Sequence, residues 1–136
     1  MHDKAFLDSN ILIYLHSEDE HNKRSISQNI LNDNVCITSI QAMNEISNVW
    51  IRKLMWSADK IEVHLDNIEQ VCDEVITISR ATINNALSLK ERYGFSYFDS
   101  LMLSSALEGN CNIIFSEDMC DGQIIEKSLK IVNPFK

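Results

Sequence analysis

The sequence is poor in the two residues that most often mark turns. Its 136 residues include three glycines and one proline, which argues against an all-β sandwich with many tight turns and favours a helix-rich fold. No glycine-rich phosphate loop, dinucleotide-binding pattern or G-x-S-x-G motif occurs. The length predicts one domain over residues 1–136, and a domain of this size buries enough surface to fold without disulfides.

Paired cysteines and long apolar runs are also missing. The chain has four cysteines: Cys36, Cys72, Cys111 and Cys120. They form no C-x-x-C pair and have no histidine at zinc spacing, so reduced, buried thiols are expected. No run approaches the roughly 20 apolar residues of a membrane helix. The first segment is interrupted by Asp8, which is wrong for a signal peptide. We therefore expect a cytoplasmic protein with no membrane partner.

Positive charge is scarce as well. The chain has 20 acidic and 12 basic residues, which gives a formal net charge of −8. Because contacts to phosphate require lysine and arginine, this balance alone argues against a nucleic-acid partner. The acidity is compatible with a phosphodiester substrate if some carboxylates surround a divalent cation, because the cation then attracts the phosphate.

Apolar periodicity predicts strands that alternate with helices. The expected strands cover residues 4–7, 35–38, 74–77 and 111–115, with a short edge strand at 130–132. The expected helices cover 9–15, 21–32, 39–56, 58–72, 79–94 and 96–109. This alternation implies an α/β fold with a mainly parallel sheet covered on both faces. Ligands bind beyond the carboxyl ends of such strands, which points to Asp8 and to the segment 116–118.

One acid falls on an apolar helix stripe. The stripe consists of Phe98, Met102, Leu103 and Ala106, and Asp99 lies within it. Burying an unpaired carboxylate costs several kcal/mol, so Asp99 is capped, protonated, paired or bound to metal. The structural alternative is a capping box in which Asp99 and Ser96 satisfy each other's backbone amides.

Three other acids have similar double interpretations. Glu45 lies at the edge of a buried stripe, where it either extends to water or faces a site. Asp8 follows a strand and fits a helix N-cap, and Asp118 fits a turn. Four acids near the strand ends of one small sheet favour metal-assisted phosphoryl transfer, with Mg²⁺ or Mn²⁺ held between Asp8 and Asp99.

Four segments, in order along the whole chain, carry a family resemblance. They are Phe6–Asn10, Asn44–Glu45, Ser96–Leu101 and Ser116–Met119. Together they resemble a PIN-domain ribonuclease, and most closely the VapC-type toxins of bacterial toxin–antitoxin pairs. The resemblance implies a three-layer α/β/α sandwich, Mg²⁺- or Mn²⁺-dependent endoribonuclease activity, homodimerisation, and inhibition by a small antitoxin protein.

The resemblance also implies roles for individual residues. By position, Asp8, Glu45, Asp99 and Asp118 would be the catalytic acids, with Asp8 and Asp99 as the metal ligands. Asn10 and Ser116 would orient these acids, and Asp121 would assist or replace Asp118.

Surface contacts are expected around the end of the third helix. Arg52, Lys53 and Lys60 are candidates for holding the RNA backbone, although solvated charge is the simpler interpretation. Nearby, Trp50 and Trp56 suit an interface with a second copy or an antitoxin. The alternative is burial of these tryptophans beneath the fourth helix.

Two other functions compete with the nuclease. A receiver-type regulatory domain also holds Mg²⁺ by carboxylates, but it needs an acid after the third strand, where this chain has Ile78 and Ser79. A PIN-like domain that has lost catalysis would serve as a binding module, and the four acids argue against it.

Overall fold

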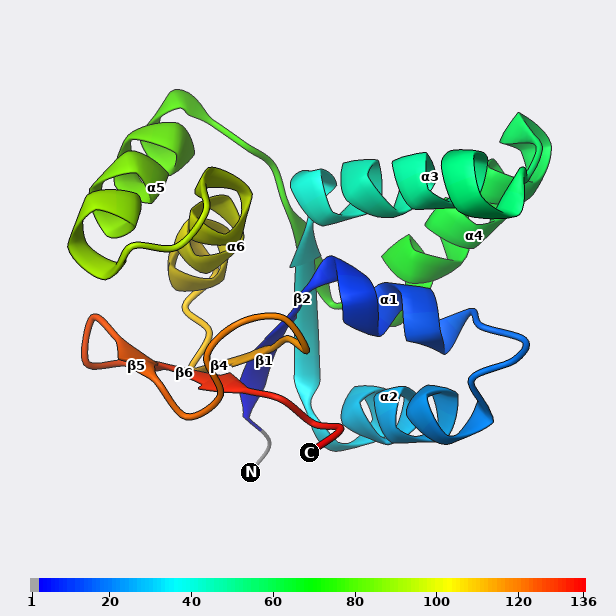
Figure 1. Cartoon of the computed structure of the whole chain (residues 1–136), viewed down its shortest axis with the longest axis horizontal. Coiled ribbons are helices and arrows are strands. Elements are labelled where there is room, and N and C mark those ends of the chain that lie inside the picture. Colours follow the sequence, from blue (N-terminus) through cyan, green and yellow to red (C-terminus); the bar gives the residue numbers. More distant parts are fainter. Residues whose placement is uncertain (1–2) are drawn as a thin grey trace.

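The computed structural model describes residues 3–136 and shows a six-stranded sheet between two layers of helices (Figure 1). The strands are β1 (Lys4–Leu7), β2 (Val35–Ser39), β3 (Glu74–Ile76), β4 (Ile113–Phe115), β5 (Ile124–Ile125) and β6 (Leu129–Val132). The helices are α1 (Ser9–Leu15), α2 (His21–Asp33), α3 (Ile40–Leu54), α4 (Ala58–Val71), α5 (Arg80–Tyr93) and α6 (Tyr97–Glu108). The predicted α/β class with a mainly parallel sheet is confirmed.

The strand order determines where a ligand can bind. The order is β3-β2-β1-β4-β6-β5, and every neighbouring pair is parallel except β5 and β6. The chain steps from β1 to β3 in one direction and then returns to β4 on the other side of β1. Right-handed crossovers therefore place α1 to α4 on one face and α5 and α6 on the other (Figure 1). The order reverses between β1 and β4, so a crevice forms at the carboxyl ends of these two strands.

One predicted strand position and one predicted helix end are wrong. The strand expected at the edge, β6, is an inner strand, because the two-residue strand β5 pairs with it and forms the edge. The third helix was expected to reach about Trp56, but α3 ends at Leu54. Met55 follows in the left-handed conformation with φ 55°, and this breaks the helical hydrogen-bond pattern.

The α3 end is buried on one side and exposed on the other. Trp50 is 1% exposed and stacks on Trp56, with ring centroids 4.7 Å apart. The rings of His16 and His64 pack against the same pair. Burial is therefore the correct interpretation for Trp50. Met55, by contrast, is 86% exposed.

Helix α6 is buried on all sides over most of its length. Each residue from Ser100 to Ala106 is buried, so Met102, Leu103 and Ala106 are buried as the predicted stripe requires, whereas Phe98 is 57% exposed and does not belong to it. Two of its three buried serines, Ser104 and Ser105, donate to backbone carbonyl oxygens, whereas the Ser100 hydroxyl has no hydrogen-bond partner among the described residues. Ser104 Oγ donates to the carbonyl oxygen of Thr82 on α5 at 2.8 Å.

The structure shows the state of the cysteines and the character of the helices. All four cysteines are free thiols, and three are buried as expected, but Cys120 is exposed. None of the helices in residues 3–136 has the length and apolar character needed to cross a membrane.

Candidate active site at the carboxyl ends of β1 and β4

Asp8 is held by two hydrogen bonds at the end of β1. It is the N-cap of α1, and its Oδ1 accepts a hydrogen bond from the Ser9 amide at 2.7 Å. Its Oδ2 accepts one from Ser116 Oγ, also at 2.7 Å. The carboxyl is only 4% exposed, and burial raises its pKa to about 6 in spite of these bonds. The N-cap interpretation is correct, but capping alone does not require a carboxyl with so costly a charge.

The loop after β4 brings a second acid beside Asp8. The Asp8 amide donates to the Phe115 carbonyl at 3.1 Å, which joins the ends of β1 and β4. Ser116 is fully buried, and its Oγ also accepts from the Asp118 amide at 3.2 Å. Asn10 Nδ2 donates to Asp118 Oδ2 at 3.1 Å. Ser116 therefore connects Asp8 with Asp118, and Asn10 holds Asp118 from α1.

Asp99 lies in the first turn of α6. Its amide donates to Ser96 Oγ at 3.2 Å, which is one half of the expected capping box. The reciprocal bond to the Ser96 amide is not found among the hydrogen bonds of residues 3–136. The Asp99 carboxyl is partly buried, and desolvation together with the charge of Asp118 raises its pKa. The hydrogen bond with Ser96 opposes this rise.

Glu45 faces the other acids from α3. Burial raises its pKa to about 7, and the charge of Asp8 is the next largest cause. The charges of Asp99 and Asp118 contribute in the same direction. One oxygen accepts a weak bond from Gln41 Nε2 at 3.4 Å. The structure thus brings together all four acids that the sequence singles out.

Asp121 is directed elsewhere. It is exposed, and its Oδ1 accepts a hydrogen bond from the Asn133 amide at 2.7 Å. Its charge is not among the causes that shift the pKa of Asp8, Glu45 or Asp99, whereas the charge of Asp118 shifts all three. Asp118 is therefore the better candidate for the fourth acid.

The donor set fits a hard divalent cation. Within the described part of the chain, no three acidic, histidine or cysteine side chains are arranged to hold an ion unaided. Mg²⁺ does not need such a cage, because it typically binds one or two carboxylates, several waters and substrate phosphates. The two ion pairs among residues 3–136 include none of the four acids. Asp8 and Asp99 therefore provide oxygen ligands whose charge is uncompensated, and a bound cation would relieve their repulsion.

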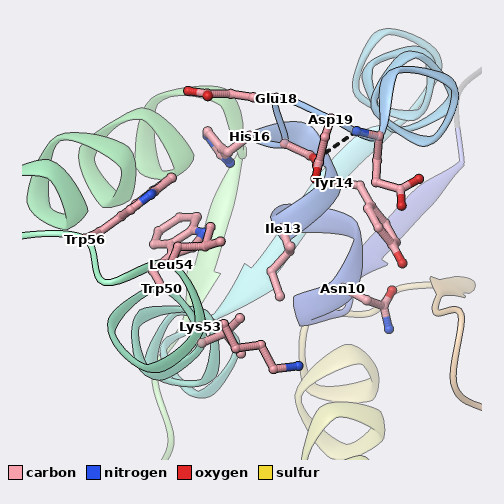
Figure 2. A pocket seen from close by; sticks show the side chains of 13 residues that line it. Asn10, Ile13, Tyr14, His16, Glu18, Asp19, Trp50, Lys53, Leu54 and Trp56 are labelled. Carbon is pink, nitrogen blue, oxygen red and sulfur yellow. Dashed lines mark hydrogen bonds between the residues drawn. The ribbon is translucent and has the colours of Figure 1, made fainter.

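A pocket of about 630 Å³ lies between α1 and α3, and none of the four acids is among the residues that line it (Figure 2). Asn10, which contacts Asp118, belongs to its lining. Figure 2 shows Lys53 and Asn10 at one end and Glu18 at the opposite end, with apolar side chains of both helices between them. The pocket thus meets the acidic site at Asn10 and runs from there along α1.

The predicted RNA-binding residues lie at the corner between α3 and α4. Arg52 and Lys53 occupy the last turn of α3, where their charge also favours the helix dipole. Lys60 Nζ lies 4.2 Å from the centre of the Trp56 ring. Only Lys53 lines the pocket, so the structure does not bring this basic group into contact with the acids.

Sequence reasoning missed a second group of charges beside the site. Glu117, between Ser116 and Asp118, accepts hydrogen bonds from Lys23 Nζ and Tyr14 OH. No local pattern marks this group, because Lys23 and Glu117 are 94 residues apart in sequence.

Solved structures with a similar fold include toxins and their complexes. A toxin–antitoxin complex from Klebsiella pneumoniae is similar with a TM-score of 0.71 and 19% identity, over 97% of this chain and 98% of that chain. The Mycobacterium tuberculosis VapC20 toxin, described as cleaving the sarcin–ricin loop, is similar with a TM-score of 0.66 and 14% identity, over 84% of this chain and 91% of that chain. FitAcB from Neisseria gonorrhoeae is similar with a TM-score of 0.65 and 15% identity, over 96% of this chain and 98% of that chain. At these identities the likeness shows the fold.

Among curated protein sequences there is no match. The family model described as the PIN domain matches residues 5–119, which include all four acids of the site. This range covers the greater part of the chain. The acids at the reversal of the strand order, the fold and the family match agree, and the protein belongs to the PIN-domain family.

Proposed function

We propose that the chain is a Mg²⁺- or Mn²⁺-dependent endoribonuclease and acts as the toxin of a VapBC-type toxin–antitoxin pair in the cytoplasm. The observation that carries this proposal is the convergence of Asp8, Glu45, Asp99 and Asp118, none of which forms an ion pair with a basic side chain within residues 3–136. PIN-domain membership supports nuclease chemistry, and the structural neighbours from toxin–antitoxin complexes support the toxin assignment.

The four acids divide into two pairs in the proposed reaction. Asp8 and Asp99 would hold the divalent cation, which would supply the positive charge that activates water and stabilises phosphodiester oxygens. The Ser9 amide and the Ser116 hydroxyl fix the Asp8 carboxyl, so its orientation is set before substrate binds. Glu45 and Asp118 face the same space and orient the attacking water, and either one can accept its proton.

The proposed RNA path follows the basic corner rather than the whole pocket. Lys53 and Arg52 are exposed beside the pocket and provide phosphate contacts. The far end of the pocket is lined by Glu18, Asp19 and Glu20, which repel a phosphate backbone. The RNA strand therefore crosses the acids near Asn10 and leaves along α3.

The same pocket suits the inhibitory partner. Its apolar centre and acidic end fit an amphipathic peptide with basic residues, which is the chemistry of a small antitoxin segment. An arginine of that segment would pair with a carboxylate of the site and compete with the cation. The exposed Ile51 and Met55 at the end of α3 support the expected homodimer, because exposed apolar groups favour association.

The test is cleavage of an end-labelled RNA by the purified chain. Cleavage is expected with Mg²⁺ or Mn²⁺ and is expected to stop in EDTA. Asp99→Asn should remove most activity and preserve the fold, because the amide has the same shape as the acid. Asp66→Asn, on the exposed side of α4, is the matched control. If RNA binds but is not cut under any of these conditions, the chain is a PIN-like binding module instead.

A further inference from the structure

The loop that carries Asp118 is held from its outer side by four residues, which we call the outer brace: Tyr14, Lys23, Glu117 and Phe135. Lys23 Nζ donates to both oxygens of Glu117, at 3.2 and 3.1 Å, and to Tyr14 OH at 3.2 Å. Tyr14 OH also donates to Glu117 Oε1 at 3.2 Å. The three polar groups therefore form a closed triangle, and each restricts the other two.

Two aromatic rings complete the brace. The Phe135 ring lies edge-on to the Tyr14 ring, with centroids 5.1 Å apart. Lys23 Nζ lies 4.6 Å from the centre of the Tyr14 ring and 5.4 Å from that of Phe135. The ammonium is thus fixed by a carboxylate on one side and by ring faces on the other. Helix α1, helix α2 and the C-terminal segment meet at Glu117, which lies in the loop after β4.

The brace reaches the acids through Asn10. The Glu117 amide donates to Asn10 Oδ1 at 3.2 Å. This bond selects one of the two orientations of the Asn10 side-chain amide, and in that orientation Nδ2 donates to Asp118 Oδ2. Moving Glu117 would therefore disturb Asp118 twice, through the backbone and through Asn10.

The site needs this support because its acids repel one another. Asp118 is exposed, and its charge raises the pKa of three neighbouring acids. A short loop under such repulsion tends to swing outward unless something holds it. The charge of Glu117 would add to the repulsion, but Lys23 neutralises that charge, and the Lys23–Glu117 ion pair also ties the loop to α2.

We propose that Lys23, through the outer brace, is a positioning residue that holds Asp118 and Asn10 beside the proposed cation ligands Asp8 and Asp99, where Asp118 would orient the attacking water and add negative charge that favours the cation. The inference rests on the proposed function for its catalytic readout. It differs from a role in RNA binding, because the Lys23 ammonium is already occupied by Glu117 and Tyr14.

The experiment compares three variants with the unmodified chain. Lys23→Met removes the anchor but keeps the length of the side chain. Lys23→Arg restores the charge and a donor. Arg92→Met breaks the ion pair with Glu126 on the β5–β6 hairpin and serves as the matched control. Lys23→Met is expected to lower kcat by about 10–100-fold, the usual effect of losing an outer partner that supports a metal site. KM should stay within about twofold, and Lys23→Arg and Arg92→Met should remain close to the unmodified chain.

A second readout does not depend on cleavage. Isothermal titration calorimetry with MnCl₂ should show weaker Mn²⁺ binding in Lys23→Met and unchanged binding in the other two variants. Hydrogen exchange should show faster exchange of the Glu117 and Asp118 amides in that variant. If the unmodified chain cuts no RNA, the proposed function fails, and these two measurements still test the brace.

Two results would overturn the inference. The first is a rise in KM with a weaker salt dependence of RNA binding and an unchanged kcat, which would make Lys23 a phosphate contact. The second is that Lys23→Met and Arg92→Met have equal Mn²⁺ affinity and equal amide exchange. The Lys23–Glu117 ion pair would then contribute only to the general stability of the fold.

Discussion

Neutralising Asp8 should stabilise the metal-free protein, although the change removes a predicted metal ligand. The carboxyl is 4% exposed, and its pKa is raised from 3.8 to about 6, chiefly by desolvation. A rise of about two pKa units corresponds to about 3 kcal/mol of unfavourable free energy for the charged form in the folded state. In Asp8→Asn, the side-chain oxygen still accepts from the Ser9 amide, and the new amide group can donate to Ser116 Oγ.

The sign of the pH dependence follows from the raised pKa. Above about pH 6 the folded protein holds a charged, buried Asp8, so the penalty is fully present. As the pH falls from 6 towards 3.8, the folded state takes up a proton before the unfolded state does, and the penalty disappears. The variant should therefore gain up to about 3 kcal/mol at pH 8 and almost nothing near pH 4.

Thermal unfolding in EDTA at several pH values measures this gain. For a domain of this length, about 3 kcal/mol corresponds to a rise in Tm on the order of 10 °C. Asp66→Asn on the exposed side of α4 should leave Tm unchanged at each pH. A Tm for Asp8→Asn that is equal to or below that of the unmodified chain at pH 8 would refute the reasoning, because it would show that the Asp8 carboxylate is stabilised where it lies.

The remaining predictions concern packing, RNA binding and inhibition. Trp50→Ala should cost about 3–5 kcal/mol in urea unfolding because the indole is buried, whereas Phe98→Ala should cost less than about 1 kcal/mol, and equal costs would contradict the described burial. Arg52→Ala and Lys53→Ala should each weaken binding of single-stranded RNA, and each should reduce the salt slope by about 0.7; an unchanged slope would remove that residue from the RNA path. The antitoxin concentration for half-inhibition should rise with Mg²⁺, and independence from Mg²⁺ would exclude an arginine that competes with the cation.

Much of the fold could be predicted because its signals are local. Each buried strand is a short apolar run, and serines before α3, α5 and α6 accept hydrogen bonds from backbone amides at the helix starts. The strand β5 gives no such signal, because it has two residues and its turn uses Glu126 and Lys127 at positive φ instead of the usual Asn-Gly. The exposure of Phe98 could not be predicted, because an apolar residue in the first turn of α6 fits the buried stripe by spacing alone.

The candidate site was predictable for a different reason. Asp99 and Glu45 stand out because charge conflicts with their apolar surroundings, and Asp8 stands out because it follows a strand. The outer brace could not be found in this way. Lys23 and Glu117 each look like ordinary surface charges, and only the packing of α2 against the loop after β4 brings them together.

Helix α1 links the acidic site mechanically to the pocket between α1 and α3. It is a rod of about 10 Å, given seven residues at 1.5 Å each. The most buried acid of the site caps one end of this rod, and Ile13 and Tyr14 on its flank line the pocket. A short helix does not bend easily, so a displacement at the flank is transmitted to the end. A peptide bound in the pocket as proposed would therefore shift the Asp8 carboxyl without touching it.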